Sequence, residues 1–260
     1  MRAWWIASAT NASFFEHFDG VFADNAIANA DQIISGDGTR LGHKIGAALL
    51  AGQQALYTEL QARFRELGGD RSVIFNGIRE GQGFAAIPNL LPYADGGEME
   101  GLGGALYKRS PNGSIDSITR LTTMHTLLNL SKQHSEKEVM LKAVPAGSMA
   151  RTEGFTAADY RANALEHYQY PLAAFLVLAG EHWLHDYTWG YRSNDYVPPI
   201  DSSGSVPGLP DLQSKAPLGW YPDYLKAPGT PLKDAVFDGA YTFTREWTGD
   251  SEQSHREWSP

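Results

Sequence analysis

Gly20-Val21-Phe22-Ala23-Asp24-Asn25 is an apolar run that ends in two polar side chains, and it is the clearest indication of the fold of this 260-residue chain. Residues 42–67 follow it with apolar side chains at helical spacing, namely Ile45, Leu49, Leu50, Leu56, Leu60 and Phe64. The pair Gly68-Gly69 then ends the helical pattern. A buried strand followed by a helix is the order that builds parallel sheets.

The same order recurs along the chain, which predicts an α/β fold made of four or five βα units. Further strands are expected at 72–77, 93–101 and 138–145, and a last one at 241–247, where the residues alternate. Helices are expected at 114–134 and 156–165. The apolar stretch 171–185 suits either a helix or a strand by periodicity, and we favour a helix. A long loop rich in Pro, Gly and Ser is expected at 196–231.

Composition restricts the class of function. With 42% hydrophobic and 20% charged residues the chain is an ordinary globular protein. Its net charge of −9 argues against nucleic acid or an anionic membrane as a partner, because both require clustered basic residues. The absence of cysteine excludes a disulfide framework, a thiolate zinc site and a cysteine nucleophile. Residues 1–9 contain too few apolar side chains for a signal peptide, so no export signal is expected in the chain as written.

Acidic residues at strand ends are the main candidates for catalysis. Asp24 closes the first strand, and Glu98 and Glu100 lie on one face of the third by the period of two. A pair of carboxyl groups at the carboxyl end of a parallel sheet is suited to acid/base cleavage of a glycosidic bond. We favour Glu100 over Glu98 because it is nearer the end of the strand. Asp24 could instead form an Asx turn, and Glu100 could be a surface acid in a Gly-rich turn.

Several of these strings, in their order along the chain, resemble hypothetical glycosyl hydrolase family 15, a group related to polygalactosaminidase-like barrels. The matching strings are Phe18-Asp19-Gly20-Val21-Phe22-Ala23-Asp24-Asn25, Asn76-Gly77, Asp95-Gly96-Gly97-Glu98-Met99-Glu100-Gly101, and the ending from Tyr221-Pro222-Asp223-Tyr224 to Thr244-Arg245-Glu246-Trp247. The resemblance implies a (β/α) TIM-barrel glycoside hydrolase with a carbohydrate substrate and no cofactor. It also implies that Asp24 is the nucleophile or base and Glu100 the acid.

In such barrels the Asp-bearing string closes the fourth strand and the Glu-bearing string closes the sixth. The resemblance therefore implies an incomplete barrel over 1–249, with strands four to eight present and the first three units absent, followed by a frayed polar tail at 250–260. Open sheet edges would favour self-association. An inactive carbohydrate-binding or structural barrel is the alternative function.

Substrate contacts are expected from polar and aromatic residues near the strand ends: Asn25, Asn76, Glu98, Trp183, Tyr187 and Trp189. Asn76 could donate to a sugar hydroxyl or simply form a turn before Gly77. The aromatic residues could stack on sugar rings or only pack. A third function, a metal-dependent hydrolase, would use His182, His185 and Asp186, which would share one face of a helix. Arg245 and Glu246 are adjacent on a strand, so at most one of them points into a site.

Overall fold

A computed structural model describes the backbone of residues 2–11, 18–26, 43–68, 70–80, 83–102, 106, 117–143, 166–187, 230–239, 242–248 and 255–258. The chain divides into two compact units. The first unit comprises Met1–Glu100, Gln133–Leu141 and Glu181–Leu184, and the second comprises Gly101–Lys132, Lys142–Gly180 and His185–Pro260. The helix expected at 156–165, nearly all of the loop expected at 196–231, and Trp189 lie outside the described residues.

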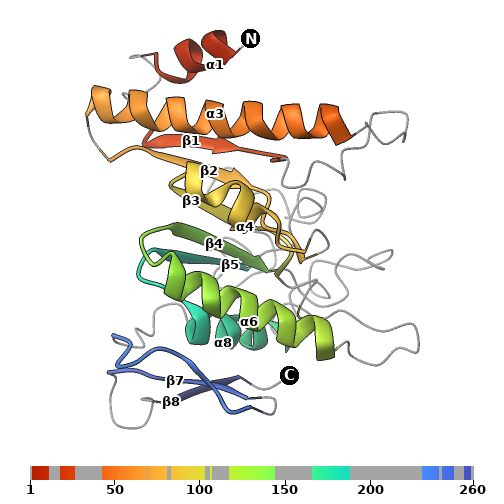
Figure 1. The fold of residues 1–260 in the computed structure, drawn as a ribbon. Coiled ribbons are helices and arrows are strands. Elements are labelled where there is room, and N and C mark those ends of the chain that lie inside the picture. The colour runs from red at the N-terminus through yellow and green to blue at the C-terminus, as the bar shows by residue number, and fades with distance from the viewer. Residues whose placement is uncertain are drawn as a thin grey trace, which may run out of the picture. The chain divides into compact units, whose positions relative to one another are not determined.

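Five parallel strands form the main sheet, in the order in which they occur along the chain (Figure 1). They are β1 (Gly20–Ala23), β2 (Ser72–Asn76), β3 (Gly96–Met99), β4 (Glu138–Ala143) and β5 (Trp183–Tyr187). Each of the strands expected at 20–25, 72–77, 93–101 and 138–145 is confirmed in shortened form. Neighbours in sequence that are also neighbours in the sheet require a crossover between them, because parallel strands cannot be joined by a tight turn.

Helices occupy these crossovers. They are α3 (His43–Leu67) before β2, α4 (Ala86–Asn89) and the 3-10 turn η3 (Leu91–Tyr93) before β3, α6 (Ser117–Gln133) before β4, and α8 (Gln169–Leu178) before β5. The helices expected at 42–67 and 114–134 are therefore confirmed. An α/β fold with a parallel sheet follows, as the sequence predicts, and it is compatible with a TIM-barrel-like architecture.

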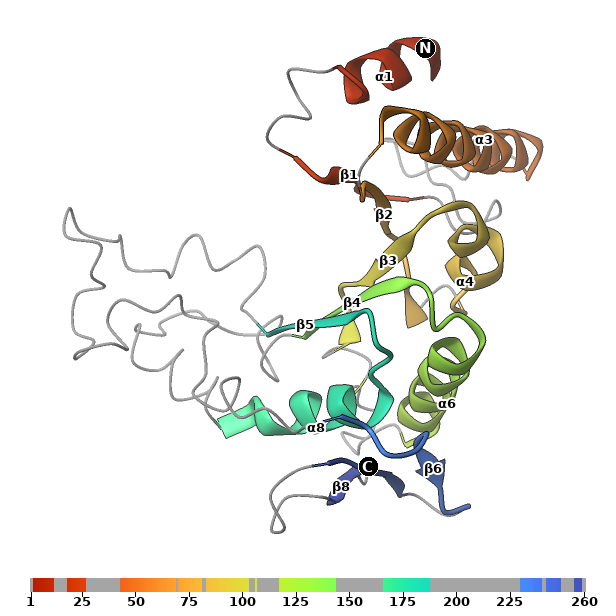
Figure 2. The same cartoon turned by 90° about the vertical axis from the view of Figure 1, so that its left-hand side faces the viewer.

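The core of the first unit forms where α3 covers β2. Tyr57, Leu60 and Phe64 are buried on α3, and the ring of Tyr57 stacks on Phe75 of β2 with centroids 6.2 Å apart. Ile45 and Leu49, which the helical pattern also placed in the apolar stripe, are 52% and 42% exposed. The apolar pattern thus predicted the helix correctly and its buried residues only toward the C-terminal half. Helix α1 (Arg2–Ala9) lies beside α3 (Figure 2). Arg2 pairs with Glu59 at 3.1 Å.

The stretch 171–185 forms a helix and then a strand. The favoured helix is confirmed up to Leu178, where α8 ends, but it is wrong for residues 183–185, which belong to β5. Residues 179–182 separate the two elements. A backbone N–H···O bond from Val139 to His182 joins β4 to the start of β5 at 3.3 Å. Residues 183–185 are therefore part of a strand because they pair with β4, and the local sequence pattern does not reveal this pairing.

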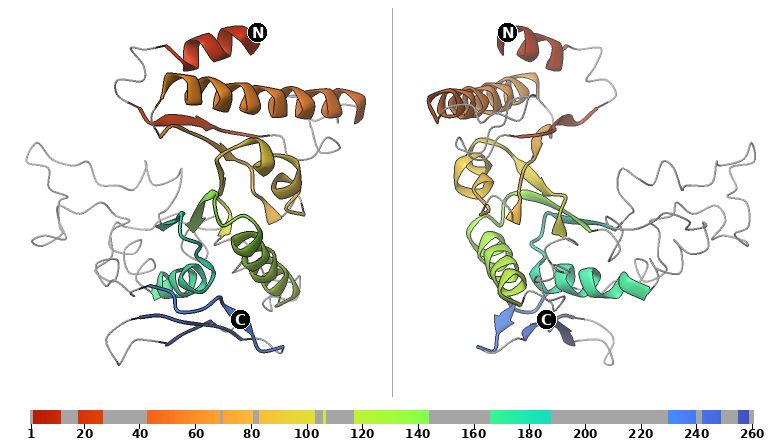
Figure 3. Two further views of the ribbon diagram at one scale, coloured as in Figure 1. Left: turned by 60° about the vertical axis from the view of Figure 1, so that its left-hand side comes forward. Right: turned by 90° about the vertical axis from the view of Figure 1, so that its right-hand side faces the viewer.

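A second, antiparallel sheet lies in the second unit and contains β6 (Val236–Phe237), β7 (Phe243–Glu246) and β8 (His255–Trp258). The strand expected at 241–247 is confirmed at 243–246, although it joins this sheet and not the parallel one. The prediction of a frayed tail at 250–260 is wrong for 255–258, because β8 pairs with β7 along its length. Both β7 and β8 contact α8 (Figure 3).

Candidate functional site

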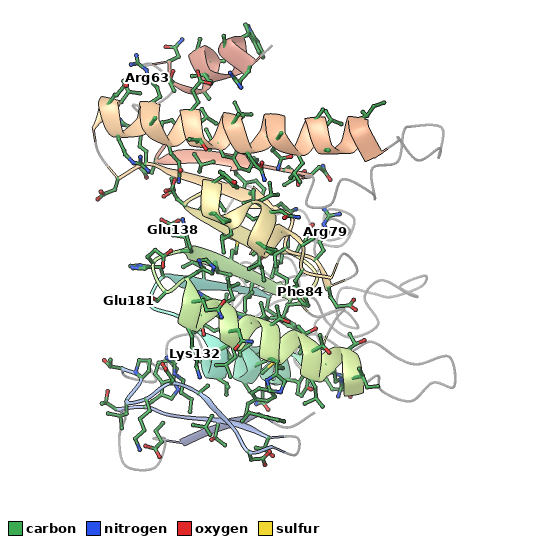
Figure 4. The ribbon with its side chains drawn as sticks, viewed as in Figure 1. Arg63, Arg79, Phe84, Lys132, Glu138 and Glu181 are labelled. Atoms are coloured by element: carbon green, nitrogen blue, oxygen red, sulfur yellow. The ribbon has the colours of Figure 1, made fainter. Side chains whose placement is uncertain are left out.

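The carboxyl ends of β1, β2 and β3 bring the predicted acids together in the first unit. The strands are parallel and in register, with Ala23 opposite Phe75 and Asn76 opposite Glu98. Asp24 directly follows β1, Asn76 is the last residue of β2, and Glu100 directly follows β3. Figure 4 shows Arg79 and Phe84, which follow β2, at the opposite end of the sheet from Glu138 and Glu181, which lie at the starts of β4 and β5.

Asn76 connects the two carboxylates. Its Nδ2 donates to Oδ1 of Asp24 at 3.0 Å and to Oε2 of Glu100 at 3.0 Å. Because both oxygens lie this close to one nitrogen, they are at most about 6 Å apart. An ionised carboxylate can only accept hydrogen bonds. The atom of the Asn76 amide that faces Asp24 and Glu100 must therefore be the NH₂ nitrogen, because the amide oxygen could not donate to them.

Asp24 is held on a second side by the residue that follows it. The backbone N–H of Asn25 donates to Oδ1 of Asp24 at 2.8 Å, and Nδ2 of Asn25 donates to Oδ2 at 3.0 Å. Asn25 has a φ of 54°, a left-handed conformation that Asn tolerates better than most residues. Its side chain is therefore engaged with Asp24, and Asn25 acts on the candidate site through this carboxylate.

Glu98 and Glu100 differ in their surroundings. Glu98 is 5% exposed, and its backbone carbonyl accepts from the N–H groups of Gly77 and Ile78 at 3.3 and 3.1 Å. Glu100 is partly exposed and contacts Asn76. The more accessible acid is thus Glu100. The choice of Glu100 over Glu98 as the catalytic acid stays a prediction.

Gly77 and Ala26 support the site, and sequence reasoning assigned them no part in it. The N–H of Ala26 donates to the carbonyl of Asn76 at 2.9 Å, which ties the segment after β1 to the end of β2. A Cβ on Gly77 would lie 3.0 Å from Cβ of Ala26 and 3.3 Å from its carbonyl oxygen. The only signal in the sequence was a glycine directly after the strand-ending Asn76, which is also a common turn signal.

The aromatic candidates are packed inside the protein. Trp183 is 5% exposed, and Tyr187, in the second unit, has no exposed surface and lies 6.4 Å from the ring of Tyr168. Rings buried to this extent have little face left for stacking on a sugar. Their burial favours the packing interpretation that the sequence left open, while Trp189 lies outside the described residues.

The metal interpretation fails on secondary structure. His185 and Asp186 are consecutive residues of the strand β5, and His182 precedes it in a turn, so the three do not share a helical face. No group of three or more His, Cys, Asp or Glu side chains arranged for a metal ion occurs among the described residues. Burial lowers the pKa of His185 to about 4, which makes its imidazole neutral at physiological pH.

Arg245 has a structural environment in the second unit. Its Nη1 donates to the carbonyls of Val177 and Ala179 at the end of α8, and its Nε donates to the carbonyl of Lys233 at 3.2 Å. Glu246, on the other side of the strand, pairs with Lys233 at 3.1 Å. Arg245 therefore satisfies helix-end carbonyls, which otherwise have no partner within the helix.

These observations define an α/β protein whose parallel sheet carries two hydrogen-bonded carboxylates at its carboxyl end. The sequence profile of hypothetical glycosyl hydrolase family 15 matches residues 1–250. The chain belongs to this family, as its strand-end motifs indicated. Comparison with curated proteins gave no match. No helix in the described part of the chain is both long and apolar enough to span a membrane.

Proposed function

We propose that this protein is a glycoside hydrolase that cleaves O-glycosidic bonds of a polysaccharide with Asp24 and Glu100 as its two carboxylates. The observation that carries the proposal is the separation of at most about 6 Å between one oxygen of each group. Glycosidases need two carboxyl groups that flank the bond, so that one protonates the leaving oxygen while the other attacks carbon or activates water.

The surroundings of Asp24 support its role as nucleophile or base. Its carboxylate has about four lone-pair sites, and three donors occupy them: two on Oδ1 from Asn76 and Asn25, and one on Oδ2 from Asn25. One site on Oδ2 therefore remains for a substrate carbon or a water molecule. The exposure of Asp24 gives that site access to a ligand.

The surroundings of Glu100 are suited to the role of general acid. Oε2 accepts from Asn76, which orients the carboxyl group for the transfer of a proton to the leaving oxygen. The family resemblance assigns the acid to this string of residues, and its partial exposure is consistent with contact to a substrate.

The proposal extends to the architecture. We assign β1 to β5 to strands four to eight of a (β/α)8 barrel, because this places Asp24 after the fourth strand and Glu100 after the sixth, as the family resemblance implies. Active sites of such barrels lie at the carboxyl ends of the strands, where Asp24, Asn76 and Glu100 lie. Self-association through the edges of the sheet stays a prediction, which sedimentation of the purified chain over a concentration series would test.

The test combines two variants with two matched controls. Asp24→Asn and Glu100→Gln should each reduce the release of reducing ends from a panel of polysaccharides by about 10²- to 10⁴-fold. Asp70→Asn and Glu181→Gln change exposed acids outside the site and should leave the rate unchanged. Circular dichroism establishes that each variant is folded.

Two results would count against the proposal. Full activity of either site variant would exclude that carboxylate. A wild-type protein that binds a polysaccharide in a pull-down but releases no reducing ends would favour the carbohydrate-binding alternative.

A further inference from the structure

We infer that Asn76 is the positioning residue of the site, and that it spaces Asp24 and Glu100 for a double displacement with retention of anomeric configuration. The inference rests on the proposed function and adds its stereochemistry and the residue that sets it. Its basis is that one amide nitrogen donates to both carboxylates, at 3.0 Å in each case.

The geometry of an amide limits how far apart the two acids can be. The two hydrogens of an NH₂ group diverge by about 120°, so two acceptors at this distance would lie about 5 Å apart, and never more than about 6 Å. Retaining glycosidases separate their carboxyl groups by about 5–5.5 Å, whereas inverting enzymes need about 6.5–9.5 Å to admit a water molecule. As long as Asn76 makes both bonds, the separation between Oδ1 of Asp24 and Oε2 of Glu100 is nearer to that of retaining enzymes than to that of inverting ones.

Asn76 acts on the carboxylates and has no surface for the substrate. The residue is 1% exposed, and its Oδ1 is buried without a hydrogen-bond partner in the described structure. Its backbone is held on both sides, by pairing opposite Glu98 and by the bond from Ala26 to its carbonyl. A buried side chain on a fixed backbone has few ways to move, which makes it a rigid spacer.

The reaction follows in two steps. In the first, Oδ2 of Asp24 attacks the anomeric carbon, the bond from that carbon to the glycosidic oxygen breaks, and the departing oxygen takes the bonding electrons and the proton of Glu100. In the second, a water oxygen attacks the same carbon and gives a proton to Glu100, while the ester bond to Asp24 breaks and returns its electrons to the carboxylate. Each attack inverts the configuration, so the product retains it.

The first experiment needs no variant. Proton NMR of a hydrolysed oligosaccharide identifies the anomer that forms before mutarotation, and we expect it to have the configuration of the substrate bond. An inverted first product would overturn the inference and leave the proposed hydrolase intact.

The second experiment removes the spacer. Asn76→Leu has nearly the same shape and no donor, and it should reduce kcat by about 10- to 100-fold with little change in KM, because misplaced catalytic groups slow the chemistry and Asn76 does not contact substrate. Asn129→Leu, on the exposed surface of α6, is the matched control. Should Asn76→Leu fail to fold, Asn76→Ser tests the same point with a smaller polar side chain.

A crystal structure of Asn76→Leu without substrate tests the spacer independently of activity. Oδ1 of Asp24 and Oε2 of Glu100, which Asn76 holds at most about 6 Å apart in the wild type, should lie farther apart in the variant because no donor links them. Unchanged carboxylate positions together with an unchanged kcat would refute the positioning role.

The two proposals fail differently. If the carboxylates move apart in Asn76→Leu but the wild type hydrolyses no carbohydrate, Asn76 still positions the acids and the proposed function is wrong. If hydrolysis occurs and neither the carboxylate positions nor kcat respond to the loss of Asn76, the function stands and the positioning role is wrong.

Discussion

Asn25 donates two hydrogen bonds to the preceding residue, Asp24, one from its backbone to Oδ1 at 2.8 Å and one from its side chain to Oδ2 at 3.0 Å. Asn25 makes this double contact with a left-handed backbone, whose φ is 54°. Substitutions of Asn25 can therefore separate the contribution of its backbone conformation from that of its side-chain donor.

Asn25→Gly should keep the backbone conformation and lose only the side-chain donor, because glycine adopts positive φ without steric penalty. Its free energy of unfolding should stay within about 0.5 kcal/mol of wild type, while Asn25→Val should lose about 1–2 kcal/mol through strain at positive φ. Urea denaturation measures both. Equal stability of the two variants would show that the left-handed conformation is not required.

Gly77→Ala should destabilise the protein by about 1–3 kcal/mol, because the added methyl would press against Ala26 and the ring of Phe75 at 3.0 and 3.3 Å. The same displacement should lower hydrolytic activity, since Ala26 follows Asn25 and Asp24 directly. The control is Gly52→Ala on the exposed face of α3, where a Cβ meets nothing within 4 Å. That change should raise stability by about 0.5–1 kcal/mol through helix propensity. Thermal melts in which both variants shift in the same direction would contradict this account.

His185 should make stability fall in mild acid. Burial lowers its pKa from the ordinary 6.5 to about 4, so between these values the unfolded chain binds a proton that the folded chain does not. Stability therefore rises with pH across this window and is lost as pH falls, by about 3 kcal/mol at pH 4. Urea titrations from pH 7 to 4 of the wild type and of His185→Leu measure this loss.

The difference in unfolding free energy between these two proteins should shrink or reverse as the pH falls, since only the wild type has the buried imidazole. Comparison with the variant cancels the contribution of other groups, such as Asp186, whose pKa burial raises against the influence of Lys142. A difference that stays constant with pH would show that His185 accepts its proton as easily in the folded chain.

Arg245→Met should lose about 1.5–3 kcal/mol of stability, because the carbonyls of Val177 and Ala179 would lose a charged donor. The variant also loses the guanidinium stacked at 5.1 Å over the ring of Trp247. Arg63→Met, at the position labelled in Figure 4, is the control. Its pair with Glu66 is exposed and contributes less than about 0.5 kcal/mol. Chemical denaturation should separate the two variants clearly, and equal losses would refute a capping role for Arg245.

Local patterns predicted the elements of this fold well, for a physical reason. A strand such as 72–76 or 138–143 and a helix such as 43–67 bury residues at a period of two or about 3.6, and that period is visible in the sequence. The local patterns failed to predict strands whose formation depends on pairing with another strand. Residues 183–187 form a strand because β4 lies beside them, and 255–258 form one because β7 does.

The candidate site shows the same division. From the sequence alone one could predict that polar residues end successive parallel strands, and so that Asp24, Asn76 and Glu100 lie at one end of a sheet. The contact between Asn76 and Glu100, the burial of Glu98, and the packing around Trp183 and Tyr187 became visible only in the folded chain. Asn76 bonds to Asp24, 52 positions away in the sequence, and to Glu100, 24 positions away. Contacts over such separations depend on how the strands align and on how the chain turns after each strand. Periodicity carries information about the face on which a residue lies, whereas the partner it meets is set by packing between distant segments.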